Sequence, residues 1–460
     1  MGPTARLAAC IVGLLAAALP LHGALAREAE AWVREPTFQA TVPVRVSGPE
    51  QAPAVLLVHG LGEAGMRDWD TVVPALAQRY RVYRLDLPGF GRATKAGLAY
   101  TPDRYAVALH HVAHAQIKRV PFFLVGHSMG AAIALRYAAR YPQDLAGLVL
   151  ADVPALIHRA AYATYLTDLG RGALPAFLAP SLGDTLNRIV GGVFARMDRD
   201  ALAPEAAVTN PRLRADLLDD DPVRIAGYAL GIENFSQDLE DVETPTLLLW
   251  GAQDRVASMR NARILAGNLA RTRLEVLEGA GHTPMLDQPD AFNTKLRGFL
   301  DAPQLPPGQR RLRTPAPLLA SERVGRCSQR DNARFQGAYL RLEIQGCRNV
   351  LIENARIGTL DIVDSTVAVN DSIIGGRGDD DGIRATNSRI VVTASRIEGA
   401  TAIQADDSRL DVAGSTVAGR RHAIATDRGA GLVFSLSHIE SPHYFGSIHT
   451  ARGLTADAPL

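Results

Sequence analysis

Cysteine is scarce in this sequence, with only three in 460 residues. One of them, Cys10, lies close to the N-terminus, which leaves Cys327 and Cys347 for the rest of the chain. So few cysteines do not support a scaffold held together by disulfides, and their spacing does not support a cysteine-based zinc site.

A charge excess of either sign is also missing, because 49 Lys and Arg residues face 48 Asp and Glu residues. Proteins that bind nucleic acid or anionic membranes need a basic excess, so the composition argues against both classes. Beyond the N-terminal segment, no apolar stretch is long enough to cross a membrane. With 460 residues, 47% of them apolar, the chain is longer than a single hydrophobic core usually accommodates, so two domains are expected.

Residues 1–26 have the pattern of a cleavable signal peptide. Arg6 supplies the positive start, residues 7–21 are mostly apolar, and Ala24-Leu25-Ala26 is a small-residue cleavage signature. We therefore expect a periplasmic or secreted protein that begins near Arg27. Two alternatives stay open: a lipoprotein box ending at Cys10, and an uncleaved anchor, although the apolar run is short and contains Pro20.

The most informative stretch runs from Phe122 to Tyr137. Phe122 to Val125 is a buried-strand pattern, Gly126-His127-Ser128-Met129-Gly130 follows at once, and apolar residues then recur at helical spacing. Strand, sharp turn and helix form the context in which G-x-S-x-G places a serine hydroxyl at the carboxyl edge of a sheet. Ser128 is therefore the candidate nucleophile, and a structural Gly-Ser turn is the alternative.

Strands and helices alternate through the first 300 residues. Strands are expected at 38–46, 54–58, 81–85, 122–125, 145–151, 246–250 and 274–277, and helices at 69–79, 102–118 and 289–300. This alternation predicts an α/β fold with a mostly parallel, doubly wound sheet over residues 27–301. Between Pro154 and Asp241 the alternation gives way to helical spacing rich in Ala, Leu, Gly and Pro, which predicts a helical cap at about 154–241 or a helical excursion packed elsewhere.

Five segments carry a family resemblance: VLLVHGLG, YRVYRLDLPGFGR, LVGHSMGAAIALRYA, LLLWGAQDRV and GAGHTPML. In order and spacing they resemble the signature blocks of the α/β-hydrolase superfamily, over roughly residues 53–300. The resemblance implies a serine hydrolase with its nucleophile, acid and base in that chain order. It says much less about the substrate, because this fold supports many reactions.

His282 and Asp254 complete the expected catalytic set. His282 lies in a Gly-rich loop straight after the last strand, where an imidazole can reach Ser128 and act as general base. A histidine base needs a carboxylate to orient it, and Asp254 follows the strand that ends at Trp250, which matches the acid position of the family. Asp152, at the end of the strand after Ser128, is the alternative acid, and a helix N-cap is the alternative role for Asp254.

The oxyanion formed on attack needs two backbone donors, for which we expect the amides of Leu61 and Met129. His59 is expected to shape the Leu61 loop. Serine at the elbow argues against haloalkane dehalogenase and epoxide hydrolase chemistry, which resembling families perform with a carboxylate nucleophile. His110, His111 and His114 have no accompanying glutamate and are expected to form a solvated helix face, with a metal site as the alternative. On the solvated reading, neither a metal nor another cofactor is predicted.

The composition and the spacing of apolar residues change after residue 301. Residues 302–322 are Pro-rich and basic and are expected to be a linker. Over 323–460, aliphatic residues recur with a period of roughly 20 residues, in three corresponding columns. These columns contain Ile383, Ile403 and Ile424; Ile390, Leu410 and Leu432; and Ile397, Val417 and Ile439.

Three short strands per period resemble a smaller, all-β, right-handed parallel β-helix, with a β-sandwich as the alternative. Cys327 and Cys347 lie one period apart. In stacked coils they can be neighbours, and an exported protein permits a disulfide between them, although two separate thiols are the alternative.

The sequence thus predicts an exported serine hydrolase that cleaves a carboxylic ester, best a small hydrophobic one, through an acyl-enzyme. An alternative is a protein that binds a polysaccharide or cell surface through its β-helix, with an accessory hydrolase domain. Acyl transfer, peptide hydrolysis and carbon–carbon bond hydrolysis use the same residues and stay open.

Overall fold

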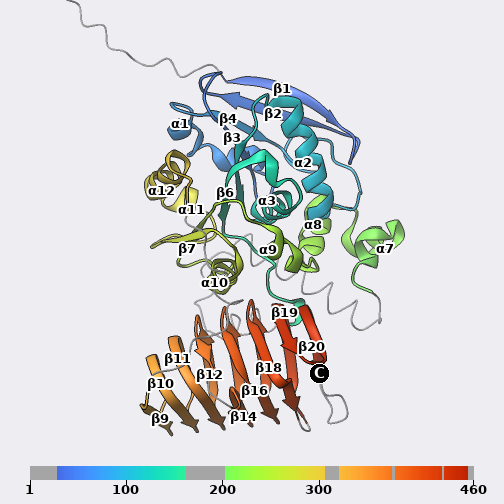
Figure 1. Cartoon of the computed structure of the whole chain (residues 1–460). Coiled ribbons are helices and arrows are strands. Elements are labelled where there is room, and N and C mark those ends of the chain that lie inside the picture. Colours follow the sequence, from blue (N-terminus) through green and yellow to red (C-terminus); the bar gives the residue numbers. More distant parts are fainter. Residues whose placement is uncertain (1–27, 162–202, 306–320, 376–378, 427–428, 454–460) are drawn as a thin grey trace, which may run out of the picture.

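The computed structural model describes residues 28–161, 203–305, 321–375, 379–426 and 429–453. They form an α/β domain followed by an all-β domain (Figure 1). The expected signal peptide and much of the expected linker lie outside the described residues. Within the described ranges, no helix has both the length and the apolar character needed to cross a bilayer.

The α/β domain is built on an eight-stranded sheet of order β1-β2-β4-β3-β5-β6-β7-β8. Its strands are β1 (Ala29–Glu35), β2 (Ala40–Ser47), β3 (Ala54–Val58), β4 (Arg81–Leu85), β5 (Phe122–His127), β6 (Leu145–Ala151), β7 (Thr246–Gly251) and β8 (Thr272–Leu277). From β4 through β8 all neighbours are parallel, whereas β1 and β2 add an antiparallel edge. Every residue of β3, β5 and β7 is buried, as expected for parallel strands covered on both faces.

Helices cover both faces of this sheet. Alternate strand residues serve opposite cores: Leu56 packs on the side of α2 (Pro102–Gln116), α3 (Met129–Arg140) and α10 (Met259–Asn268), and Leu57 on the side of α12 (Pro289–Asp301). The remaining short helices of the domain are η1 (Gly65–Trp69), α1 (Val73–Leu76), η2 (Pro142–Asp144) and α11 (Pro284–Asp287). The predicted α/β architecture is confirmed.

Three local predictions were wrong or incomplete. The expected helix at 69–79 is replaced by η1 and a single turn, α1, since Pro74 lacks the N–H that an interior helix position must donate. The predicted edge strand at 38–46 is the second strand of a hairpin, β1–β2. Helix α10 was not anticipated, because two arginines in its first turns obscure the apolar pattern.

The described part of the cap region contains short helices joined by irregular segments. It contains α6 (Ala206–Thr209), α7 (Pro211–Leu218), α8 (Pro222–Gly231) and α9 (Ser236–Asp241), and residues 162–202 of the expected cap lie outside the described residues. Buried residues of α8 such as Ile225 and Tyr228 belong to the same apolar cluster as Met129, and Leu61 packs against that cluster. The described part of the cap is therefore joined to the core beside Ser128.

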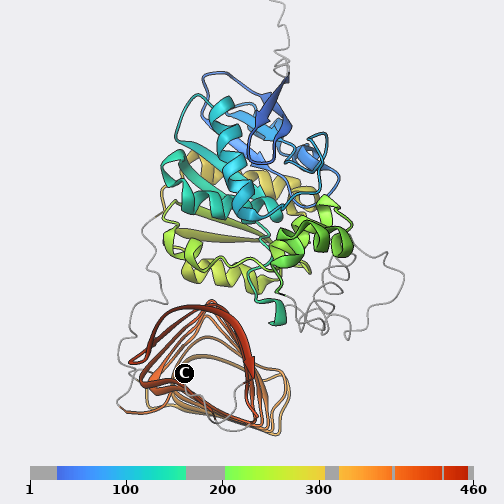
Figure 2. The ribbon, with the colours of Figure 1, turned by 90° about the vertical axis from the view of Figure 1, so that its right-hand side faces the viewer.

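The second domain is a closed, mostly parallel all-β structure around one aliphatic core (Figure 2). Its strands are β9 (Val324–Ser328), β10 (Arg334–Gln345), β11 (Val350–Val363), β12 (Thr366–Asn370), β13 (Ile373–Ile374), β14 (Ile383–Thr386), β15 (Arg389–Thr393), β16 (Arg396–Asp406), β17 (Arg409–Ala413), β18 (Thr416–Thr426), β19 (Gly431–Ser441) and β20 (Tyr444–Gly453). Only β20 pairs antiparallel among the described strands of this domain.

The three predicted columns of aliphatic residues are present in the strand register. Ile383 pairs with Ile403, which pairs with Ile424, and the other two columns pair in the same way. A disulfide joins Cys327 and Cys347, whose Cα atoms are 6.5 Å apart. The sequence did not reveal that buried serines line the bends: the amide of Ser388, for example, donates to the hydroxyl of Ser408 at 3.1 Å.

The two domains contact each other through α10. Arg260 binds Asp411, Arg263 pairs with Asp371, and the side-chain amide of Asn268 donates to the carbonyl of Gly414 at 2.9 Å. Ala413 of the second domain joins the apolar cluster of the first. The all-β domain is thus docked on the helix that follows the Asp254 loop.

Candidate functional site

Ser128 occupies a strained turn between β5 and α3. Its φ of 52° and ψ of −121° lie in a region that non-glycine residues rarely adopt. The flanking glycines are required by close packing: a Cβ at Gly126 would lie 2.3 Å from the carbonyl oxygen of Gly130, and one at Gly130 would lie 2.3 Å from that of Val58. This is the strand–turn–helix geometry that the G-x-S-x-G pattern predicted.

The structure brings Ser128, His282 and Asp254 into one hydrogen-bonded chain. His282 Nε2 lies 2.9 Å from Ser128 Oγ, and its Nδ1 lies 2.8 Å from Asp254 Oδ2. Each comes from a loop after a strand: β5, β8 and β7, respectively. Because these strands are parallel, their carboxyl ends meet at one edge of the sheet.

Asp254 is fixed from both sides. Its second oxygen, Oδ1, accepts the amides of Val256 and Ala257 at 2.7 and 3.0 Å, and its side chain is fully buried. Burial alone would raise the pKa of Asp254, but the hydrogen bond and charge of His282, together with the Ala257 amide, lower it below the usual value. Asp254 therefore stays an anion, the state in which it can orient an imidazole and stabilise its charged form.

Asp152, the alternative acid, lies behind Asp254 with no hydrogen bond to His282 among the described interactions. It is completely buried, and its Oδ1 accepts the amide of Gly251 at 3.0 Å. Burial, and then the negative charge of Asp254, raise the pKa of Asp152 well above its usual value. A neutral Asp152 can donate its hydroxyl to Asp254, so the two carboxyl groups have different roles.

His127, the variable residue before Ser128 in the pentapeptide, positions the His282 loop and was missed by the sequence reasoning. Its Nε2 donates to the backbone carbonyl of His282 at 2.6 Å. Burial, assisted by the neighbouring His282, lowers the pKa of His127 to about 3, so the ring is neutral. Asp287 supports the same loop by accepting the amide of Gly281 at 2.8 Å.

The loop expected to supply an oxyanion donor lies directly against the nucleophile. A Cβ on Gly60, the residue before Leu61, would lie 3.1 Å from the Ser128 Cβ. Met129 is the first residue of α3, where backbone amides have no partner inside the helix. His59 shapes the loop, as expected: its Nδ1 donates to the Gly60 carbonyl at 2.7 Å, and its Nε2 accepts the Leu87 amide at 2.9 Å.

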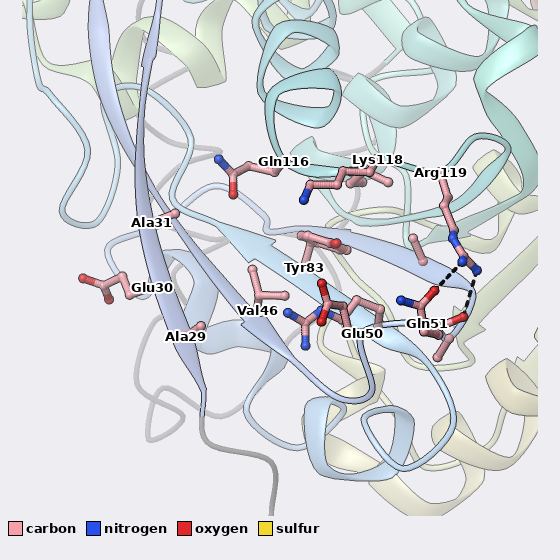
Figure 3. Close-up of a pocket in the computed structure, with 14 residues that line it drawn as sticks. Ala29, Glu30, Ala31, Val46, Glu50, Gln51, Tyr83, Gln116, Lys118 and Arg119 are labelled. Carbon is pink, nitrogen blue, oxygen red and sulfur yellow. Dashed lines mark hydrogen bonds between the residues drawn. The ribbon is translucent and has the colours of Figure 1, made fainter.

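A cavity of about 280 Å³ lies away from this constellation, beside the β1–β2 hairpin (Figure 3). Its wall includes Glu30, Tyr83 and Lys118, and Arg119 binds Gln51 at one end. Neither this cavity nor a second one of about 300 Å³, between the cap and His449, is lined by the three hydrogen-bonded residues. The candidate active site is therefore identified by its chemistry.

Comparison with known families agrees with the fold and the constellation. The model of the alpha/beta hydrolase fold family matches residues 53–289, more than half of the chain. The chain belongs to this family. It is a serine hydrolase of the α/β-hydrolase fold, and its relatives include esterases and lipases.

Two curated relatives illustrate these similarities. The hydrolase is 29% identical over 267 residues to a pimeloyl-[acyl-carrier protein] methyl ester esterase from Aeromonas hydrophila, covering 54% of this chain and 96% of the relative. It is 26% identical over 256 residues to monoacylglycerol lipase ABHD6 from Homo sapiens, covering 52% of this chain and 73% of the relative. Among solved structures, it resembles a membrane phospholipase A described as a bacterial virulence factor. The sequence identity is 27%, the TM-score is 0.45, and the match covers 60% of this chain and 86% of the other.

Proposed function

We propose that this hydrolase cleaves carboxylic esters through a covalent acyl-enzyme formed on Ser128. The observation that carries the proposal is the continuous hydrogen-bonded chain from Ser128 through His282 to Asp254. A serine hydroxyl becomes an effective nucleophile when a base removes its proton during attack, and this chain has the parts and the order required.

In the first half of the reaction, Ser128 Oγ attacks the ester carbonyl while His282 Nε2 accepts the hydroxyl proton. Asp254 stabilises the resulting imidazolium through Nδ1. The negative charge on the former carbonyl oxygen is bound by the amides of Met129 and Leu61. His282 then gives the proton to the departing alcohol oxygen, and the ester carbon–oxygen bond breaks.

In the second half, water replaces the alcohol. His282 accepts a proton from water as its oxygen attacks the acyl carbon, and the same two amides bind the second oxyanion. Collapse of this intermediate breaks the bond to Ser128 Oγ, which takes the proton back from His282. The carboxylic acid leaves, and no other reactant is consumed.

A modestly sized hydrophobic ester is the substrate class we favour. Apolar residues of the described cap and Leu61 belong to or pack on one cluster beside Ser128. The curated relatives are named for a pimeloyl-[acyl-carrier protein] methyl ester and for monoacylglycerol, both of which are esters. A site of this kind binds an acyl chain by burial and selects the ester group with a few polar contacts.

Labelling with a fluorophosphonate probe tests the proposal. Wild type should be labelled, and Ser128→Ala should not be. Hydrolysis of p-nitrophenyl esters of increasing acyl length should require Ser128 and show an optimum. Ser128→Ala with full esterase activity, or folded wild type that neither reacts with the probe nor hydrolyses any ester of the series, would exclude this function.

We also infer from the N-terminal sequence that the hydrolase is exported to the periplasm or secreted. The mature protein recovered from its native host should begin near Arg27; a mature chain that still begins at Met1 would contradict export by cleavage.

For the second domain we propose a right-handed parallel β-helix. Support comes from the parallel pairing of each strand with one about a repeat later, as between Ile383, Ile403 and Ile424.

A further inference from the structure

Helix α2 carries histidines whose arrangement differs from the expected solvated face. His111 is exposed, as expected. His110 and His114 lie one turn apart and are instead directed at Asp144, the last residue of η2. The acidic partner comes from a segment 30 residues away in sequence, so inspection of the helix alone could not reveal it.

The three side chains converge on one point. Asp144 Oδ2 lies 3.0 Å from His110 Nδ1 and 2.9 Å from His114 Nε2, and all three atoms lie within 4.8 Å of one another. Donor atoms arranged tetrahedrally at zinc bond lengths of about 2.0–2.1 Å are separated by roughly 3.4 Å. Small side-chain movements would therefore place all three around one ion.

Surrounding residues hold the cluster in place before any ion binds. The Tyr137 hydroxyl donates to Asp144 Oδ2 at 2.6 Å, and the His110 ring stacks on Tyr141 with centroids 3.9 Å apart. Hydrogen bonds of this kind orient metal-binding carboxylates in known sites. The Asp144 side chain is 4% exposed, whereas that of His114 is 45% exposed, so the cluster has an anchored side and a side open to solvent.

The donor atoms of the cluster suit a cation. Two imidazole nitrogens and one carboxylate oxygen are donors that Zn²⁺ and similar divalent transition-metal ions prefer.

We propose that His110, His114 and Asp144 form a binding site for a divalent transition-metal ion of the Zn²⁺ class, with water in the remaining coordination position. Asp144 directly precedes β6, at the amino end of the strand, whereas Ser128 follows the carboxyl end of its parallel neighbour β5. The ion would thus link α2 to the segment between α3 and β6, remote from the reacting atoms. Its role would be to stabilise the α/β domain.

The test uses the full-length protein without a histidine tag. Zinc binding is measured by isothermal titration calorimetry, and thermal unfolding is followed with and without zinc. Wild type should bind zinc and unfold at a higher temperature in its presence. His114→Ala should weaken this binding by about tenfold or more and remove the thermal shift, whereas His111→Ala, which removes an exposed histidine from the same helix, should retain both.

Asp144→Asn provides a second variant, because the amide oxygen can still accept the Tyr137 hydrogen bond while the negative charge is removed. It too should lose the binding. Wild type without zinc binding or thermal shift would overturn the proposal. So would full binding in folded His114→Ala and Asp144→Asn, which would place the zinc elsewhere, for example at the Asp152, Asp254 and His282 group.

Discussion

Arg260 and Asp411 form a two-point ion pair that joins the domains. Arg260 Nη1 lies 2.7 Å from Asp411 Oδ2, and its Nη2 lies 2.9 Å from Oδ1. Both side chains are largely buried, and Arg260 also donates to the Thr393 hydroxyl at 2.9 Å. Since α10 follows the Asp254 loop, the second domain is anchored six residues after the proposed catalytic acid.

Arg260→Ala should destabilise this junction. Loss of a largely buried guanidinium leaves the Asp411 carboxylate without its strongest partner and should lower the free energy of unfolding by about 2–3 kcal/mol. Urea unfolding followed by tryptophan fluorescence is suitable because Trp32, Trp69 and Trp250 are the three tryptophans of the chain and all lie in the α/β domain. A smaller effect on calorimetric unfolding of the second domain is also expected.

Arg79→Ala is the matched control, since the Arg79–Asp301 pair lies within one domain and the Arg79 side chain is 66% exposed. Exposed pairs contribute less than about 1 kcal/mol. A double-mutant cycle with Asp411→Ala isolates the pair. A coupling energy near zero would mean that the observed contact does not stabilise the junction.

The two buried carboxyl groups should respond differently to amide substitution. Asp254→Asn removes the anion that holds His282 and should reduce kcat for ester hydrolysis by about 10³- to 10⁴-fold. Asp152→Asn should change kcat by less than about tenfold, because the amide can accept the Gly251 hydrogen bond and donate to Asp254 as a neutral acid would. Steady-state kinetics of the two variants, with circular dichroism to confirm folding, provides the measurement.

A reversed pattern would transfer the acid role to Asp152. Reaction rates with a fluorophosphonate probe give an independent comparison, since they report activation of Ser128 without turnover. Asp152→Asn should react nearly as fast as wild type and Asp254→Asn far more slowly. Equal loss in both variants would contradict the division of roles inferred from their environments.

Much of the α/β domain could be predicted because its signals are local. Continuous apolar runs identified β3, β5 and β7. The glycines on either side of Ser128 identified a tight turn, because the neighbouring backbone lies too close to leave room for a side chain. The loops after parallel strands necessarily meet at one edge, so His282 and Asp254 could be placed near Ser128 before their distances were known.

The features that were missed depend on contacts between distant segments. His127 could not be assigned a role until the His282 carbonyl was seen 2.6 Å from its Nε2. The contacts of Asp144 with His110 and His114 of α2 could not be predicted, because the residues are far apart in sequence. Helix α10 directs Arg260 and Arg263 at the second domain, so its polar face reflects an interface that the sequence pattern alone could not distinguish from a solvated surface.

His127 should make the α/β domain less stable in mild acid. Its pKa is about 3 in the folded protein and about 6.5 when exposed, so between these values the unfolded chain binds a proton that the folded protein does not. Stability therefore falls as pH decreases from 6.5 towards 3. Between pH 7.5 and pH 5 this residue alone should lower the free energy of unfolding by about 2 kcal/mol.

Urea unfolding of wild type and His127→Gln, followed by tryptophan fluorescence at both pH values, measures this contribution. Glutamine can still donate to the His282 carbonyl but does not titrate. Contributions from other ionisable groups are common to both proteins and cancel in the comparison. Between pH 7.5 and pH 5, the free energy of unfolding of His127→Gln should fall by about 2 kcal/mol less than that of wild type. If the free energy of unfolding of the two proteins changes with pH in parallel, His127 is not held neutral.

The Cys327–Cys347 disulfide should stabilise the beginning of the all-β domain. It closes a loop with a sequence separation of 20 residues, and a cross-link of this size restricts the unfolded chain enough to contribute about 3 kcal/mol. Replacing both cysteines with serine should therefore lower the calorimetric stability of the second domain, and a reducing agent should do the same to wild type alone. Tryptophan fluorescence of the α/β domain serves as the internal control, since its unfolding should shift far less. If reductant leaves the wild-type transition unchanged and quantification finds two free thiols, the bond does not form in the native protein.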